Sequence, residues 1–162
     1  MPTLYSAVGC KFYIGAAIDD DEDLAEDLTA ADYSGETWTQ IKNWTNMGAI
    51  GDVAQLITQQ LLDRKRDVKV KGTRNAGSME NVFARKRGDA GQTALIAAEK
   101  SDLNYAFKIA YNDMPSGGTS PTLAYFYGLV MNASHAASAA NDVRNLNSTI
   151  EINSNLVFVD AT

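Results

Sequence analysis

The sequence predicts a mainly β domain, an antiparallel β-sandwich or barrel with one α-helix. Apolar and polar residues alternate along several segments, as they do along strands with one buried face. Helical spacing with a clear start signal occurs once, at about 89–101. Many strands with one helix are typical of antiparallel sandwiches and barrels, and 162 residues fit a single domain spanning 1–162.

The predicted strands follow from this alternation and from one apolar run. The longer alternating segments are 12–18, with Phe12, Ile14, Ala16 and Ile18 on one face, then 68–71, 105–111 and 146–152. Shorter strands are predicted at 38–41, 47–50 and 156–159. The run 122–131 is apolar on both faces, which is typical of a central strand, and the open turn 115–121 before it predicts a hairpin.

The helix prediction depends on a start signal. Asp89, followed three residues later by Gln92, has the form of a capping box. The apolar face that follows consists mostly of alanine: Ala90, Ala94, Leu95, Ala97 and Ala98. Small side chains on that face predict a helix that lies close to a sheet.

The segment 52–63 admits two interpretations. Val53, Leu56 and Ile57 have helical spacing, whereas Leu62 falls off that face. The segment is either a helix or a long arm that becomes ordered on a neighbouring molecule.

Charge is sorted into two blocks, although the chain as a whole carries a net charge of −6. The acidic block, 19–36, holds nine acidic residues and no basic one, and the basic block, 64–87, holds nine basic residues against Asp67 and Glu80. Separated patches of opposite sign can attract copies of a subunit head to tail, and two solvated loops are the alternative. The candidate inter-subunit contacts are Arg64, Lys65, Arg66, Asp20, Asp21 and Glu22.

No catalytic, cofactor or metal site is predicted, and the chain is not expected to be an enzyme. His135, the only histidine, lies in a small-residue stretch at 133–140 that we interpret as a connection, and no motif supplies a partner for it. Cys10 is the only cysteine, so it forms no internal disulfide. A single cysteine is consistent with folding in a reducing compartment. The acidic run 19–23 lacks the spacing and glycine of a calcium loop.

Two partner classes are also disfavoured by composition. No run of 18 or more apolar residues exists, so we expect no contact with a membrane through a spanning helix. The net acidity argues against a general nucleic-acid binder, which is normally basic.

A set of segments occurs in a distinctive order along the chain. In sequence they are KFYIGAAI (11–18), WTQI (38–41), NMGAIG (46–51), VKVKGTRNAGSMENVFAR (68–85), DAGQTAL (89–95), YAFKIAYND (105–113) and YFYGLVM (125–131). This order resembles the tail tube (major tail) proteins of long-tailed bacteriophages, over about residues 11–152.

The resemblance implies a structural role. Such proteins form rings, usually hexameric, whose inner sheets join into a continuous barrel. The rings stack around a tape measure protein, tail terminator and tail tip proteins close the tube, and double-stranded DNA passes through without tight binding. The location implied is the virion tail, after assembly in the host bacterial cytoplasm. The long loop at 52–66 becomes an arm that reaches a neighbouring subunit or ring, and 19–36 an acidic loop.

Two other functions remain possible beside a phage tail tube subunit. One is an inner-tube protein of a contractile tail or secretion apparatus, which shares the fold. The other is a monomeric β-barrel that binds a small ligand in an interior cavity. An acidic bore repels phosphate, so a net negative subunit suits a conduit through which DNA slides.

Overall fold

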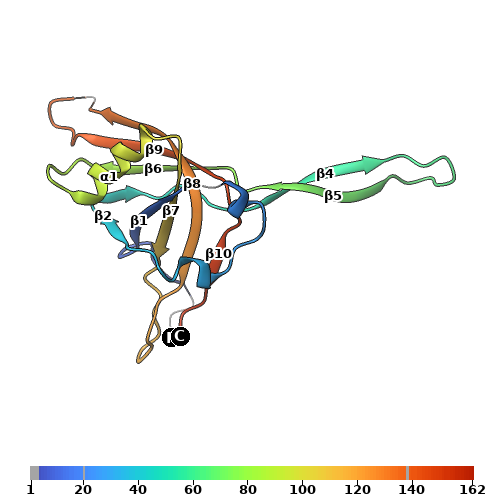
Figure 1. Ribbon diagram of the computed structural model, residues 1–162, viewed down its shortest axis with the longest axis horizontal. Helices are drawn as coiled ribbons and strands as arrows, with labels where there is room; N and C mark the ends of the chain where they lie inside the picture. Colours follow the sequence, from blue (N-terminus) through green and yellow to red (C-terminus); the bar gives the residue numbers. More distant parts are fainter. Residues whose placement is uncertain (1–3, 20, 138) are drawn as a thin grey trace.

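The computed structural model describes residues 4–19, 21–137 and 139–162, and it is built mainly from antiparallel β-strands (Figure 1). The main sheet has the order β2-β1-β7-β8-β9-β6-β3, and β10 pairs with β8 as well. Its strands are β1 (Lys11–Ile18), β2 (Thr39–Ile41), β3 (Trp44–Asn46), β6 (Ser78–Ala84), β7 (Asn104–Ala110), β8 (Leu123–Ala136), β9 (Asn145–Ile152) and β10 (Val157–Val159). The predicted fold class is confirmed, with one α-helix among the described residues.

The sheet curls until strands near its two ends meet across an aromatic core. Phe12 of β1 stacks on Trp44 of β3, with ring centroids 5.0 Å apart. Phe107 stacks on Phe12 at 5.5 Å and on Phe126 at 5.4 Å, and all three phenylalanines are fully buried. Aromatic rings therefore fill the interior, where a ligand-binding barrel has a cavity.

Strand β8 is central, as the apolar run at 122–131 predicted, but it is longer than expected. Residues 133–136, interpreted as part of a connection, continue the strand and pair with β9, from Ala133 opposite Ser148 to Ala136 opposite Asn145. His135 is an exposed strand residue here. Small side chains at these positions do not prevent pairing, because the backbone supplies the hydrogen bonds of the ladder.

Two other strand predictions need correction. Ala16 does not continue the face of Phe12 and Ile14, because an irregularity between Ile14 and Ala17 shifts the register and leaves Ala16 exposed. The strand predicted at 47–50 is wrong, since β3 ends at Asn46. The chain there lies so close to the backbone of Glu80 that a side chain at Gly48 would collide with it.

Helix α1 (Ala90–Glu99) confirms the predicted helix, and Asp89 caps it by accepting a hydrogen bond from the Gln92 backbone N at 3.0 Å. Its buried face is rotated from the predicted one. Gly91, Gln92, Leu95 and Ala98 are buried, whereas Ala90 and Ala97 are exposed. Gly91 permits this close packing, because a Cβ there would meet the backbone of Gln40 and Ile41 in β2.

The Gln92 side chain does not complete the predicted capping box. It is fully buried, and its Nε2 donates to the carbonyl oxygens of Lys42 and Ala84, both at 3.0 Å. Its Oε1 accepts from the Lys86 backbone N at 3.0 Å and from Arg85 Nη1 at 2.9 Å. One side chain thus joins α1 to the turn between β2 and β3 and to the end of β6.

The acidic block covers part of the outer face of the sheet. It contains two short 3₁₀ helices, η1 (Asp21–Leu24) and η2 (Ala30–Tyr33). Tyr33, only 2% exposed, stacks on Tyr125 and Tyr127 at 5.0 and 5.2 Å. Asn155 accepts from the Leu28 backbone N at 2.8 Å and donates to its carbonyl at 3.0 Å. The segment expected as an acidic loop is therefore fastened to the sheet.

This attachment makes stability sensitive to alkaline pH. Burial, with the nearby Glu36 carboxylate that accepts a hydrogen bond from its hydroxyl at 3.2 Å, raises the pKa of Tyr127 from 10.0 to about 12. The folded state thus favours the neutral phenol of Tyr127. The contribution of this phenol to the free energy of unfolding is complete below pH 10 and is lost as the pH rises toward 12. We expect the free energy of unfolding to fall more steeply over this range in the wild type than in Tyr127→Phe, measured by urea denaturation. Equal slopes would contradict the prediction.

No helix among the described residues is long and apolar enough to cross a membrane.

Candidate subunit interface

A two-stranded hairpin projects from the body of the molecule (Figure 1). It consists of β4 (Val53–Gln59) and β5 (Val68–Asn75), which pair with each other antiparallel in a sheet of their own. The helix interpretation of 52–63 is therefore wrong, because most of that segment is a strand. Whether the hairpin reaches a neighbouring subunit stays a prediction. A lone two-stranded hairpin is marginally stable in water, so it requires support from another surface.

The register gives the hairpin two chemically different faces. Ile57 lies opposite Val70 and Gln59 opposite Val68, which places their side chains on one side. With Val53 on the same side of β4, we call Val53, Ile57, Val68 and Val70 the apolar face. On the other side, Thr58 lies opposite Lys69, Leu56 opposite Lys71 and Ala54 opposite Arg74. We call Lys69, Lys71 and Arg74 the basic face.

The apolar face lacks cover within the described chain. Val53, Ile57 and Val70 are 69%, 48% and 51% exposed. Three large apolar side chains exposed together on a thin projection mark an interaction surface more than an ordinary surface patch.

The hairpin tip, which we define as residues 60–67, carries the predicted basic contacts. Arg64, Lys65 and Arg66 are exposed there, and Leu62 is fully exposed beside them. Within the described part of the chain these three basic residues form no ion pair; the pair near the hairpin base joins Arg74 and Asp52 at 3.0 Å.

The predicted acidic contacts lie on the body instead. Asp21 and Glu22 belong to η1, and Asp20 lies outside the described residues. The tip is at the far end of the hairpin from the body (Figure 1), so its basic residues lie away from η1 within one chain, whereas Arg74 at the hairpin base lines a pocket together with Glu26 and Asp27. That the predicted basic and acidic contacts meet one another between subunits stays a prediction.

A second surface, which sequence reasoning missed, is the outer side of β6, β9 and β8. Three rows of directly paired residues cross it. Five of these residues have small polar side chains, two are glutamates, two are apolar, and none is lysine or arginine: Ser78, Glu151 and Leu129; Glu80, Thr149 and Asn132; Val82, Asn147 and Ser134. We call these the polar sheet face. The pattern that signals it is the alternation in 145–152, where the residues between the polar ones are buried.

Comparison with known proteins found similar structures but no similar sequences. No protein-family model matches the sequence, and no curated protein matches it. A chain from an extracellular contractile injection system sheath–tube complex aligns with a TM-score of 0.67 at 9% identity, covering 98% of this chain and 93% of that one. The SPP1 tail tube aligns with a TM-score of 0.66 at 13% identity, covering 97% and 80%.

A third structure aligns over nearly the whole chain. A chain from the anti-feeding prophage baseplate, six-fold symmetrised, aligns with a TM-score of 0.65 at 8% identity, covering 99% of this chain and 98% of that one. The protein therefore has the tail tube fold that occurs in phage tails and contractile injection systems.

Proposed function

We propose that the protein is a structural subunit of the tail tube of a long-tailed bacteriophage. It assembles into stacked rings, most simply hexameric, that form a conduit for the genome. The observation that carries the proposal is the hairpin, which exposes Ile57 and Val70 on a projection of a tail tube fold. Such a surface requires a partner, and a repeating subunit provides one in its next copy.

In this proposal the polar sheet face lines the bore. Its Asn, Ser and Thr side chains remain hydrated, and Glu80 and Glu151 repel phosphate. Because binding to DNA depends mostly on cations that neutralise phosphates, a face without them lets the duplex pass without tight binding.

The edges of this face favour ring closure. Strand β3 pairs only with β6 among the described strands, and β8 pairs with β7 only up to Gly128, so its second half has a partner on one side. Open edges pair readily with other strands. Joining β3 of one subunit to the second half of β8 of the next would give a continuous inner barrel.

The partners follow from the same role. The subunit binds itself in stacked rings around a tape measure protein, and tail terminator and tail tip proteins close the two ends. Double-stranded DNA is a passing occupant, and no membrane is involved. The protein resides in the virion tail after assembly in the host bacterial cytoplasm.

Electron microscopy of the purified protein tests this function. We expect rings or tubes in negative stain at high protein concentration, because the exposed hairpin and open edges are present on every copy. A protein that stays monomeric at all concentrations would contradict the proposal.

An inner tube of a contractile tail or secretion apparatus is the second candidate. The sheath–tube complex shares the fold to the same degree as the SPP1 tail tube, with TM-scores of 0.67 and 0.66. A sheath protein that binds the assembled tube would distinguish it from the first. A monomeric ligand-binding barrel is disfavoured, because stacked aromatic rings occupy the interior.

A further inference from the structure

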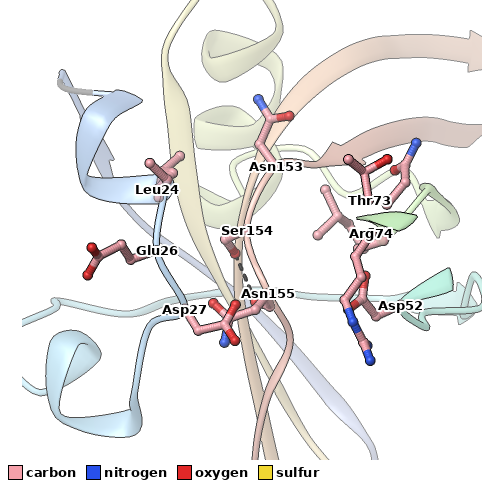
Figure 2. A pocket seen from close by; sticks show the side chains of 13 residues that line it. Leu24, Glu26, Asp27, Asp52, Thr73, Arg74, Asn153, Ser154 and Asn155 are labelled. Atoms are coloured by element: carbon pink, nitrogen blue, oxygen red, sulfur yellow. Dashed lines mark hydrogen bonds and ion pairs between the residues drawn. The ribbon is translucent and has the colours of Figure 1, made fainter. Parts of the chain in front are cut away.

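An open pocket of about 440 Å³ lies at the base of the hairpin (Figure 2). The acidic block supplies one wall, the start of the hairpin another, and the turn after β9 the third. Leu24 and Ala25 contribute most of its apolar surface, and Arg74, paired with Asp52 at 3.0 Å, also lines it. The rim carries the carboxylates of Glu26 and Asp27, both exposed.

We propose that this pocket receives the hairpin tip of a second copy of the chain. The proposal deepens the tube-subunit function and rests on it, because it names the surface that a neighbouring copy occupies. Its occupant is specified by the chemistry of the tip, in which Leu62 is fully exposed beside the basic residues Arg64 and Arg66.

The two surfaces match in charge, and part of the pocket wall is apolar. Leu62 has no cover in its own chain, and the pocket offers apolar surface from the half-buried Leu24 and the exposed Ala25. Around that anchor, Arg64 and Arg66 would meet the carboxylates of Glu26 and Asp27. An apolar side chain in a pocket with charges at the rim is the usual arrangement of an interface hot spot. Exposed ion pairs alone contribute little, so the leucine is the main anchor.

Geometry excludes docking of the tip into the pocket of its own chain. Strand β4 has seven residues and extends the hairpin by roughly 23 Å before the tip begins, at about 3.3 Å per residue. Pairing with β5 along this length holds the tip away from the body. Each copy therefore offers the tip of its hairpin and a pocket at the base of its hairpin. When the tip of one copy occupies the pocket of the next, the resulting head-to-tail contacts generate rings or filaments.

Cysteine cross-linking between two different chains tests the contact. Both chains carry Cys10→Ser; one also carries Leu62→Cys at the tip, and the other Ala25→Cys in the pocket lining. A matched control replaces the pocket variant with Val143→Cys, an exposed position on the loop between β8 and β9. Circular dichroism establishes that all three chains are folded.

Under mild oxidation we expect at least about tenfold more mixed dimer from the tip and pocket pair than from the tip and control pair, because docking raises the effective concentration of the two sulfurs. Equal yields would overturn the proposal. A second measurement uses no cysteine: Leu62→Ser is expected to weaken self-association, and unchanged association would also overturn it.

The outcomes separate this inference from the function on which it rests. Tubes that form without preferential cross-linking refute the tip contact and leave the tube function standing. Cross-linked chains that never build rings or tubes support the tip contact and refute the tube function.

Discussion

Replacing Ile57 and Val70 together by aspartate is expected to abolish tube formation and to leave the subunit folded. The two residues lie directly opposite each other on the apolar face of the hairpin, and about half of each side chain is exposed in the single chain. Little of the core depends on them. In a tube, however, they would be covered by a neighbouring copy, and two carboxylates there would have to lose water without a partner.

The size of the effect follows from apolar burial. Fully burying a valine or isoleucine side chain contributes about 1.5–3 kcal/mol, and about half of each residue is already buried in the single chain, so losing both contacts removes roughly 1.5–3 kcal/mol. That corresponds to roughly a ten- to hundredfold rise in the protein concentration needed for assembly. Sedimentation of assembled material, with negative-stain microscopy of the pellet, measures this concentration.

Neighbouring positions in β4 provide the matched control. Ile57→Asp places a carboxylate on the apolar face, and Thr58→Asp places the same group one residue away on the side of Lys69. We expect Ile57→Asp to prevent assembly and Thr58→Asp to retain it. If both variants lose assembly to the same extent, the apolar face is not the docking surface, and the hairpin acts through its charge or its backbone.

The same hairpin shows where sequence reasoning reaches its limit. Period-two patterns at 105–111 and 146–152 predicted strands correctly, because each has one face in the core of its own chain. In β4 the consecutive residues Leu56 and Ile57 place apolar side chains on both faces. Adjacent apolar residues with neighbours three or four positions away imitate a helix, and only the pairing with β5 resolves the pattern.

The candidate site was predictable in part for a similar reason. The basic run Arg64, Lys65 and Arg66 stands out in any sequence, and the structure places it at an exposed tip. The polar sheet face does not stand out, because Asn147 and Thr149 are residue types that are common in loops. Its meaning depends on three strands from distant parts of the chain that lie side by side.

Helix α1 shows that a local sequence motif can predict where a helix starts without predicting the contacts of its side chains. Asp89 and Gln92 predicted the start of α1, and the cap from Asp89 is present. The glutamine was expected to return the bond, but its side chain bonds instead to backbone groups of Lys42, Ala84 and Lys86. Those groups are remote or outside the helix, so a local motif did not reveal them.

Gln92→Ala is expected to destabilise the subunit by about 3–5 kcal/mol, which is near the upper end for single substitutions. The side chain is fully buried, and its loss leaves the carbonyls of Lys42 and Ala84 and the backbone N of Lys86 without their partner. Each buried polar group left unsatisfied costs about 1–3 kcal/mol. Lys42 and Lys86 are exposed residues, so water reaches their backbone groups and relieves part of this cost, and the expected total is less than three times the cost of one group.

Thr93→Ala is the control from the same helical turn. Its hydroxyl donates to the Asp89 carbonyl at 2.9 Å, but the residue is exposed, so water replaces the bond and the expected cost is below about 1 kcal/mol. Both substitutions belong in the Ile57→Asp, Val70→Asp background, because assembly would otherwise add concentration-dependent stability to the native state. A Gln92→Ala variant no less stable in urea than Thr93→Ala would show that α1 is held by Leu95 and Ala98 packing alone. The polar link from the helix to β6 and to the turn before β3, the two strands that flank the hairpin, would then be dispensable for the fold.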